Sequence, residues 1–280
     1  MTPNTVWLAS YPKSGNTWLR AVYTALVHDA PPDVNSLLGA ELPASRRLFD
    51  NALGLRSSDL RADEIDRLRP RADELVAAAT GNAKWRKIHD ALLPGPDGEL
   101  IVSVEATRCA LYLVRDPRDV AVSLAHHLDG SLRAAVESLS SHMAMFGASR
   151  GSGGLGVQLR QRLSTWSGHV RSWTEQTLFP VHVVRYEDCT REPVATFMEA
   201  FRAAGVNTSR DRLERAIKWA SWDALAAQED EAGFREKQSR QHAFFRRGQA
   251  GGWVDELPEE LAELVVSEHG DVMAQLGYLA

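Results

Sequence analysis

The sequence predicts an α/β protein in which a mostly parallel β-sheet is flanked by helices. Short, apolar, β-prone segments at Thr5–Ala9, Ala110–Val114 and Val181–Tyr186 alternate with longer segments whose apolar residues recur at helical spacing. The first two of these strands run directly into a turn and a helix, which is how a βα unit begins. The sequence shows no linker that would separate two domains, so we expect one domain over residues 1–280.

Local patterns predict the remaining elements. Apolar residues at helical spacing indicate helices, a proline marks the first residue of one of them, and Pro/Gly clusters indicate turns. In chain order we expect a helix at Trp18–Val27, polar helical segments within Asp29–Thr80, a short strand at Trp85–His89, a turn at Pro94–Gly98, and helices at Pro117–Leu128, Leu159–Leu178, Val194–Ala204, Ser209–Leu225 and Pro258–Leu276. The Gly/Ser-rich segment Gly147–Gly156 and the polar segment Gln228–Gly252 are expected to be mobile loops.

Composition restricts the class of function. An apolar content of 44% and a charged content of 25% are typical of a soluble globular protein. The formal net charge of −5 predicts no nucleic-acid partner, and an anionic nucleotide would need a local basic site. Cys109 and Cys189 are too few for a disulfide framework and favour a reducing compartment. The apolar run Val6–Ala9 is too short for a signal peptide or a membrane span, so a cytoplasmic protein without a membrane partner is expected.

The segment Ser10–Thr17 is the first candidate phosphate site. It follows a strand and opens a helix, where the first-turn N–H groups and the helix dipole favour an anion. Gly15 permits close approach of a phosphate, Lys13 adds a positive charge, and Ser14 adds a hydroxyl donor. The order of residues is not that of a Walker A loop, because the lysine precedes the glycine. The residues alone fit a phosphate loop and an ordinary βα turn with a solvated lysine about equally well.

The segment Leu111–Ser123 repeats the strand–turn–helix arrangement. Arg115 lies at the end of the strand, and Ser123 lies two turns into the following helix. The fork of an arginine side chain suits a dianionic phosphate. The alternative is a capped helix with Arg–Asp pairs on its surface.

Four stretches of the chain resemble the nucleotide-binding motifs of the sulfotransferases that use 3'-phosphoadenosine-5'-phosphosulfate (PAPS). Trp7–Trp18 resembles the family's 5'-phosphosulfate loop, usually Tyr-Pro-Lys-Ser-Gly-Thr-Thr-Trp, with Asn16 in place of one threonine. Leu111–Ser123 resembles the 3'-phosphate motif, and Val184–Asp188 is similar to the strand-end Tyr-Glu-Asp. Phe245–Trp253 resembles the C-terminal loop Arg-Lys-Gly-x-x-Gly-Asp-Trp, although an arginine replaces the lysine and a glycine the aspartate.

The resemblance implies a fold, an activity and a set of site residues. The implied fold is a single-domain, P-loop-like three-layer α/β sandwich around a central parallel sheet. The implied activity is transfer of a sulfuryl group from PAPS to a hydroxyl of a small-molecule acceptor (an alcohol, a phenol or a secondary metabolite), without a metal. A looser similarity, of Ala220–Trp222 to the family's Thr-Ser-Phe, adds Trp222. The implied nucleotide-binding residues are Lys13, Ser14, Gly15, Asn16, Thr17, Trp18, Arg115, Ser123, Tyr186, Trp222, Arg246, Arg247 and Gly248.

The segment Lys84–His89 resembles the family's Lys-x-His. The resemblance implies that His89 is the general base and that Lys87, together with Lys13, holds the transferring group. Histidine is also the side chain best suited to accept a proton near neutral pH. His126 and His127 are weaker candidates for the base.

Two other functions compete with the sulfotransferase. A nucleotide kinase or other P-loop phosphotransferase would need a lysine after the glycines and a magnesium-binding carboxylate, and the sequence shows neither. A non-catalytic nucleotide-binding module would not need the pair Lys87 and His89. Short similarities at Ala9–Lys13 and Val170–Glu175 favour the bacterial sulfotransferases that modify secondary metabolites. The sequence assigns neither the acceptor nor an oligomeric state.

Overall fold

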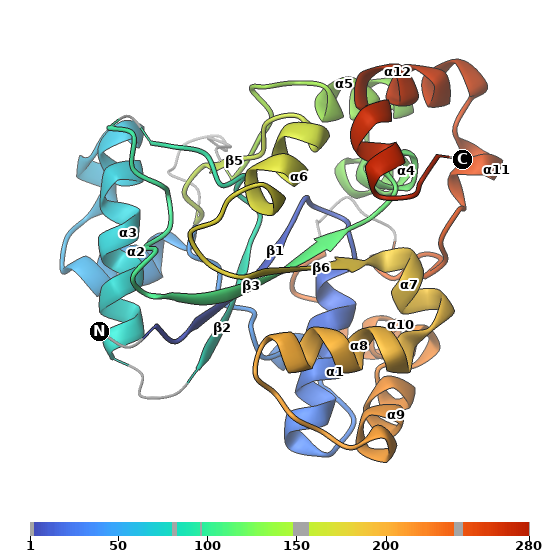
Figure 1. Cartoon of the computed structure of the whole chain (residues 1–280), viewed down its shortest axis with the longest axis horizontal. Coiled ribbons are helices and arrows are strands. Elements are labelled where there is room, and N and C mark those ends of the chain that lie inside the picture. Colours follow the sequence, from blue (N-terminus) through green and yellow to red (C-terminus); the bar gives the residue numbers. More distant parts are fainter. Residues whose placement is uncertain (1–2, 80–82, 96, 148–156, 238–242, 280) are drawn as a thin grey trace.

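Four parallel strands form the central sheet in the computed structural model (Figure 1), which describes residues 3–79, 83–95, 97–147, 157–237 and 243–279. The sheet order is β2 (Lys84–Ile88), β1 (Thr5–Ser10), β3 (Thr107–Val114) and β6 (Val181–Arg185). Every neighbouring pair is parallel. This confirms the predicted α/β class with a central parallel sheet.

Helices cover both faces of the sheet, as Figure 1 shows. Alternate residues of a strand point to opposite faces, so Trp7 and Tyr112 enter one core while Leu8 and Leu111 enter the other. The first core is closed by α4 (Pro117–Leu128), α5 (Leu132–Leu139), α6 (Trp166–Thr174) and α12 (Glu259–Gln275). The second is closed by α1 (Asn16–His28), α8 (Pro193–Ala203), α9 (Arg210–Trp219) and α10 (Trp222–Ala232). Strands that are buried on both faces explain the continuous apolar runs of the sequence.

The described part of the polar region, residues 29–79, packs beside the edge strand β2. It contains the short 3-10 helices η1 (Val34–Ser36) and η2 (Ser57–Asp59) and the helices α2 (Arg46–Leu53) and α3 (Ala62–Ala78). Two ion pairs with buried side chains lie at this junction: Arg69 to Asp90 at 2.7 Å, and Arg86 to Asp73 at 2.6 Å. Arg69 and Asp73 of α3 therefore face the protein interior and form ion pairs there. Charged residues on the buried face of a helix weaken the apolar periodicity from which a helix is predicted.

Two helix predictions need correction. The helix predicted at Leu159–Leu178 begins only at Trp166, because Thr165 caps it by accepting a hydrogen bond from the Gly168 N–H at 2.9 Å. The residues before it include β5 (Gln161–Arg162), which pairs antiparallel with β4 (Met145–Phe146). The helix predicted at Ser209–Leu225 is two helices, α9 and α10, with Ser221 as the N-cap of the second.

Two other predicted segments also differ from the structure. Tyr186, predicted as the last residue of a strand, begins the short helix α7 (Tyr186–Arg191). The segment Gln228–Gly252 is not wholly a loop, because α10 continues to Ala232, and the short helix α11 (Trp253–Glu256) follows it. Of the two predicted mobile loops, Gly147–Gly156 lies outside the described residues from residue 148 onward, and Gln228–Gly252 does so only at residues 238–242.

A membrane span is not found in the described part of the chain. None of its helices is both long enough and apolar enough to cross a bilayer.

Candidate active site

A cavity of about 520 Å³ lies at the carboxyl ends of the parallel strands. The loop after β1, His89 after β2, Arg115 after β3 and Tyr186 after β6 all line it. Ligands of open α/β sheets bind at this end of the strands. The predicted site residues that line the cavity are Lys13, Gly15, Asn16, Thr17, Trp18, Lys87, His89, Arg115, Ser123, Tyr186, Trp222, Arg246, Arg247 and Gly248. Ser14 is buried in the same loop.

The loop between β1 and α1 has the features of an anion site. Its backbone turns through positive φ angles of 72° at Lys13 and 96° at Gly15. Gly15 is the N-cap of α1, and no side chain caps the first turn of that helix. Among the described residues, the buried Oγ of Ser14 has no hydrogen-bond partner. Uncapped amides and an unpaired hydroxyl at a helix N-terminus suit a phosphate or sulfate group.

Asn16 and Thr17 hold this loop in place through their side chains. The Asn16 Nδ2 group donates to the Leu8 carbonyl at 2.9 Å and to the Ser10 Oγ at 3.3 Å. Thr17 Oγ1 accepts a hydrogen bond from Arg20 at 3.3 Å. The side chain that replaces the family's usual threonine therefore ties the start of α1 to β1.

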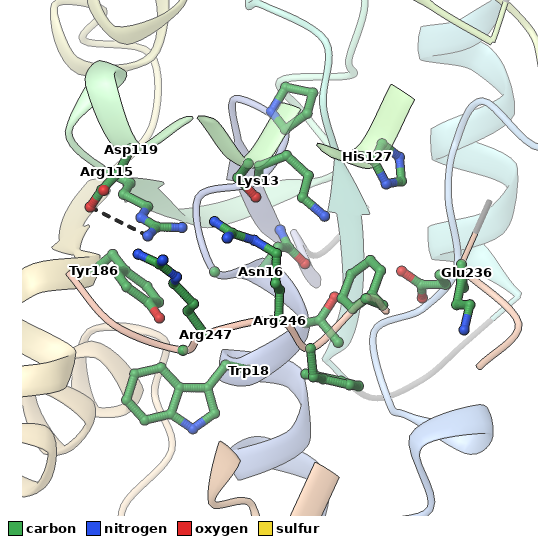
Figure 2. Close-up of a pocket in the computed structure, with 18 of the residues that line it drawn as sticks. Lys13, Asn16, Trp18, Arg115, Asp119, His127, Tyr186, Glu236, Arg246 and Arg247 are labelled. Carbon is green, nitrogen blue, oxygen red and sulfur yellow. Dashed lines mark ion pairs between the residues drawn. The ribbon is translucent and has the colours of Figure 1, made fainter. Parts of the chain in front are cut away.

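Lys13 extends into the cavity, as Figure 2 shows. Its Nζ lies 4.1 Å from the centroid of the Phe244 ring, a cation–π contact. Burial, with a smaller contribution from the charge of Arg115, lowers the pKa of Lys13 to about 8. A desolvated ammonium group lacks the water that would stabilise its charge, so a bound anion would stabilise it strongly.

Arg115 is fixed from three sides. Its guanidinium lies 4.4 Å over the Tyr186 ring, Nη2 lies 3.3 Å from the Asp119 carboxylate (Figure 2), and the same nitrogen donates to the Gln249 carbonyl at 2.8 Å. The Nε group is buried and has no partner among the described residues. Ser123 lines the same cavity from α4.

Arg246 and Arg247 reach into the cavity from the chain before α11 (Figure 2). The Glu256 carboxylate lies 2.8 Å from Arg246 and 3.2 Å from Arg247, so both guanidinium groups are oriented by the same side chain. Gly248 follows with a φ of 63°, and its backbone lies so close to the Trp222 ring that a Cβ atom would overlap the indole.

His89 is held in one tautomer. Its Nδ1–H donates to the Ser10 carbonyl at 2.9 Å, which leaves the lone pair on Nε2. Burial, followed by the charge of Lys87, lowers the pKa of His89 to about 3, so the imidazole is neutral near neutral pH. Behind it, His169 Nε2 donates to the His89 carbonyl at 3.1 Å, and the Tyr112 hydroxyl donates to His169 Nδ1 at 2.8 Å.

Lys87 lies in an ion pair that the sequence did not indicate. Its Nζ is 2.9 Å from Glu236 Oε2, and Glu236 Oε1 is 2.8 Å from Arg20. Burial lowers the pKa of Lys87. Of the weaker candidates for the base, His127 lines the cavity, whereas His126 bonds Glu256 through Nε2 at 2.8 Å.

Comparison with known proteins identifies the family. A family model described as a sulfotransferase domain matches residues 3–277. The chain belongs to the sulfotransferase family. It is 28% identical to cytosolic sulfotransferase 13 of Arabidopsis thaliana over 269 residues, which cover 91% of this chain and 72% of that protein. It is 25% identical to flavonol 3-sulfotransferase of Flaveria bidentis over 284 residues, which cover 94% and 80% respectively.

Solved structures of the same fold agree with this membership. Retinol dehydratase in complex with androsterone and the inactive cofactor PAP has a TM-score of 0.63 at 19% identity, covering 98% of this sulfotransferase and 81% of that chain. A mouse sulfotransferase complexed with PAP has a TM-score of 0.60 at 19% identity, covering 99% and 89%. At such low identity the likeness establishes the fold, and it confirms the predicted P-loop-like architecture.

Family membership confirms the predicted enzyme class. The protein is a PAPS-dependent sulfotransferase, which transfers a sulfuryl group from PAPS to a hydroxyl. This decides against the nucleotide kinase and the non-catalytic module. Within the described ranges, no group of three His, Cys, Asp or Glu side chains is arranged to hold a metal ion, and metal independence stays a prediction.

Three residues of the sulfotransferase site escaped the sequence prediction. Asp119 accepts hydrogen bonds from the N–H groups of Gly251 at 2.7 Å and Trp253 at 2.9 Å, in addition to pairing with Arg115. Phe244 covers Lys13, and Glu236 pairs with Lys87. Arg115 and Asp119 are only four residues apart, so a local contact between them was a detectable signal. No sequence spacing connects the other two with their partners.

Proposed function

We propose that this sulfotransferase binds PAPS with its 5'-phosphosulfate on the loop Ser10–Thr17 and its 3'-phosphate beside Arg115. The proposal is carried by one observation: the uncapped start of α1, the partly buried Lys13 and the neutral His89 face a single cavity. Cations stand on both sides of that cavity, which suits a ligand with negative charge at two separate positions.

In this proposal, some residues around the cavity bind the two phosphates of the nucleotide and others bind its adenine ring. The amides at the start of α1 and the Ser14 hydroxyl hold the 5'-phosphosulfate, while Arg115, Ser123 and the pair Arg246 and Arg247 hold the 3'-phosphate. The aromatic rings of Trp18, Tyr186 and Trp222 line the space between them and offer stacking surfaces for the adenine. The buried, unpaired polar atoms of Ser14 and Arg115 support this assignment, because burial of such atoms is costly unless a ligand completes their hydrogen bonds.

The chemistry assigned to the site is in-line sulfuryl transfer. His89 Nε2 takes the proton of the acceptor hydroxyl as the hydroxyl oxygen bonds to sulfur. Lys13 stabilises the negative charge that the departing phosphate gains when its bond to sulfur breaks. Lys87 and the loop amides stabilise the sulfuryl oxygens. This is catalysis by positioning and electrostatic stabilisation, as in phosphoryl transfer.

The acceptor in this proposal is a small molecule with a hydroxyl on an apolar body, such as a phenol or an alcohol. Beyond the phosphate loop the cavity is lined by apolar and aromatic side chains together with two glutamines: Leu42, Phe146, Phe244, Gln158 and Gln161. Relatives named for flavonols, and a fold neighbour solved with androsterone, support a planar or ring-shaped acceptor. Other relatives are named cytosolic, which supports the cytoplasmic location expected from composition.

Two measurements test this function. Calorimetry with PAP, ATP and ADP in the presence of EDTA should give tight binding for PAP only, because only PAP carries phosphates at both positions. A screen of phenols and alcohols with labelled PAPS should then identify an acceptor. Equal affinity for ATP, or a magnesium requirement for PAP, would contradict the nucleotide assignment.

A further inference from the structure

Glu236 is a carboxylate within the cavity that bridges two buried cations. Figure 2 shows it across the cavity from Arg115. One oxygen lies 2.9 Å from Lys87 Nζ and the other 2.8 Å from Arg20 Nη2. The Arg20 side chain is 0% exposed and that of Lys87 12%. A buried positive charge without a counter-ion is strongly destabilising. Glu236 supplies the negative charge for both of these cations.

The chain around Glu236 is fixed by contacts that need no ligand. Phe234 is buried, and its ring lies 4.7 Å from the Phe244 ring. The Glu229 carboxylate, at the end of α10, accepts hydrogen bonds from the Phe244 N–H at 2.7 Å and pairs with Lys237 at 3.1 Å. These contacts hold the residues on both sides of Glu236 against the body of the protein.

We propose that Glu236 is a positioning residue for sulfuryl transfer, which holds the Lys87 ammonium in its charged form at the wall of the cavity beside His89. The inference rests on the role proposed for Lys87. Lys87 lies in β2 and His89 directly follows that strand, and both side chains line the same cavity. By holding the Lys87 ammonium in place, the Glu236 carboxylate also sets the distance between Lys87 and His89.

The ion pair with Glu236 affects the protonation of Lys87. The charged and titratable groups around Lys87 are Arg20 on α1, Lys13 on the phosphate loop, His89 at the end of its own strand, and Glu236. Burial and the charge of Arg20 lower the pKa of Lys87, and Glu236 opposes both. Without the carboxylate, the lysine would lose its proton at a lower pH.

Glu236 does not serve as the base itself. Burial alone would raise its pKa, but Lys87 and Arg20 outweigh burial and hold the pKa of Glu236 at about 2. Both of its oxygens are occupied by cations. A carboxylate whose two oxygens each pair with a cation is poorly placed to take a proton, whereas the Nδ1–H bond of His89 to Ser10 leaves the lone pair on its Nε2 available.

The test replaces Glu236 with glutamine, which removes the charge at nearly constant volume. Turnover of labelled PAPS, by acceptor transfer or by slow hydrolysis, is measured against pH. Because an opposite charge at this distance changes a pKa by about 1–3 units, the alkaline limb of kcat for Glu236→Gln should move to lower pH by about that amount. PAP affinity should fall by a smaller factor than turnover, since Glu236 acts on Lys13 only at a distance and its oxygens pair with Lys87 and Arg20. Glu231→Gln is the matched control, because it removes an exposed carboxylate from the end of α10 and should leave the profile unchanged.

A double-mutant cycle with Lys87→Met separates the possible failures. If Glu236 acts through Lys87, Glu236→Gln should lower turnover no further in the Lys87→Met background. Wild-type turnover of Lys87→Met would reject the proposed function of Lys87. Loss of turnover in Lys87→Met together with an unshifted profile in Glu236→Gln would reject only the role of Glu236. Should Glu236→Gln fail to fold, Glu236→Asp keeps the charge and should retain the alkaline limb at the wild-type pH with a lower kcat; a shifted limb would overturn the proposal.

Discussion

Gly15 connects the phosphate loop to the aromatic wall of the nucleotide site, so Gly15→Ala perturbs both. The residue has a φ of 96°, and an added Cβ would lie 2.6 Å from Cδ2 of the Tyr186 ring. That ring carries the Arg115 guanidinium at 4.4 Å and meets the Trp18 ring at 5.9 Å. A methyl group here must displace the tyrosine, and with it two neighbours proposed to bind the nucleotide.

The cost of this substitution has two parts. An alanine in the left-handed region costs about 1–2 kcal/mol. Overpacking of a buried site costs about 1–3 kcal/mol more, because the tyrosine ring cannot yield freely. We therefore expect Gly15→Ala to lower the free energy of unfolding by about 2–5 kcal/mol. PAP affinity should fall as well, because displacement of the Tyr186 ring also displaces the Arg115 guanidinium that lies over it.

Urea unfolding and PAP calorimetry measure the two effects, and Gly54→Ala is the control. Gly54 has a φ of 67° with nothing within 4 Å of the added Cβ, so its substitution reports the backbone cost alone. Measured in a Tyr186→Ala background, Gly15→Ala should cost only the backbone part, because the ring that the methyl group would overlap is gone. Equal destabilisation by Gly15→Ala and Gly54→Ala, with unchanged PAP affinity, would refute the reasoning.

Three further predictions concern the proposed site. His89→Gln should lower turnover by about 10²–10⁴-fold with PAP affinity nearly unchanged, and wild-type turnover under rate-limiting chemistry would remove His89 as the base. Arg115→Ala should weaken PAP by about 10–150-fold in calorimetry but ADP far less, because the lost hydrogen bonds serve the 3'-phosphate; equal losses would contradict this role. Burial lowers the pKa of Lys13 from 10.5 to about 8, so between these values the unfolded chain binds more protons and the contribution of Lys13 to stability rises with pH. PAP binding should take up a proton just above pH 8, seen by calorimetry in buffers of different ionisation enthalpy, and binding without uptake would show that Lys13 is already charged.

The helix errors show where local patterns stop deciding structure. The predicted helices at Leu159–Leu178 and Ser209–Leu225 had suitable apolar spacing, yet Thr165 and Ser221 accept backbone N–H groups and begin new helices there. A side chain that caps a new helix interrupts the helix that the apolar spacing predicts. Whether the helix continues or restarts at the cap depends on the tertiary contacts of the flanking residues. By contrast, α4 has the predicted bounds, because Pro117 fixes its start.

The sequence by itself determined the α/β class, the family and the two strand–turn–helix motifs at Ser10–Trp18 and Leu111–Ser123. These are contiguous, and their geometry follows from backbone hydrogen bonding and the conformational limits of nearby residues. Only the tertiary structure decided that Glu236 reaches Lys87, 149 residues away. It likewise decided that Phe244 covers Lys13. Contacts between distant segments depend on how whole elements pack, and side-chain periodicity within one segment carries no information about its partner.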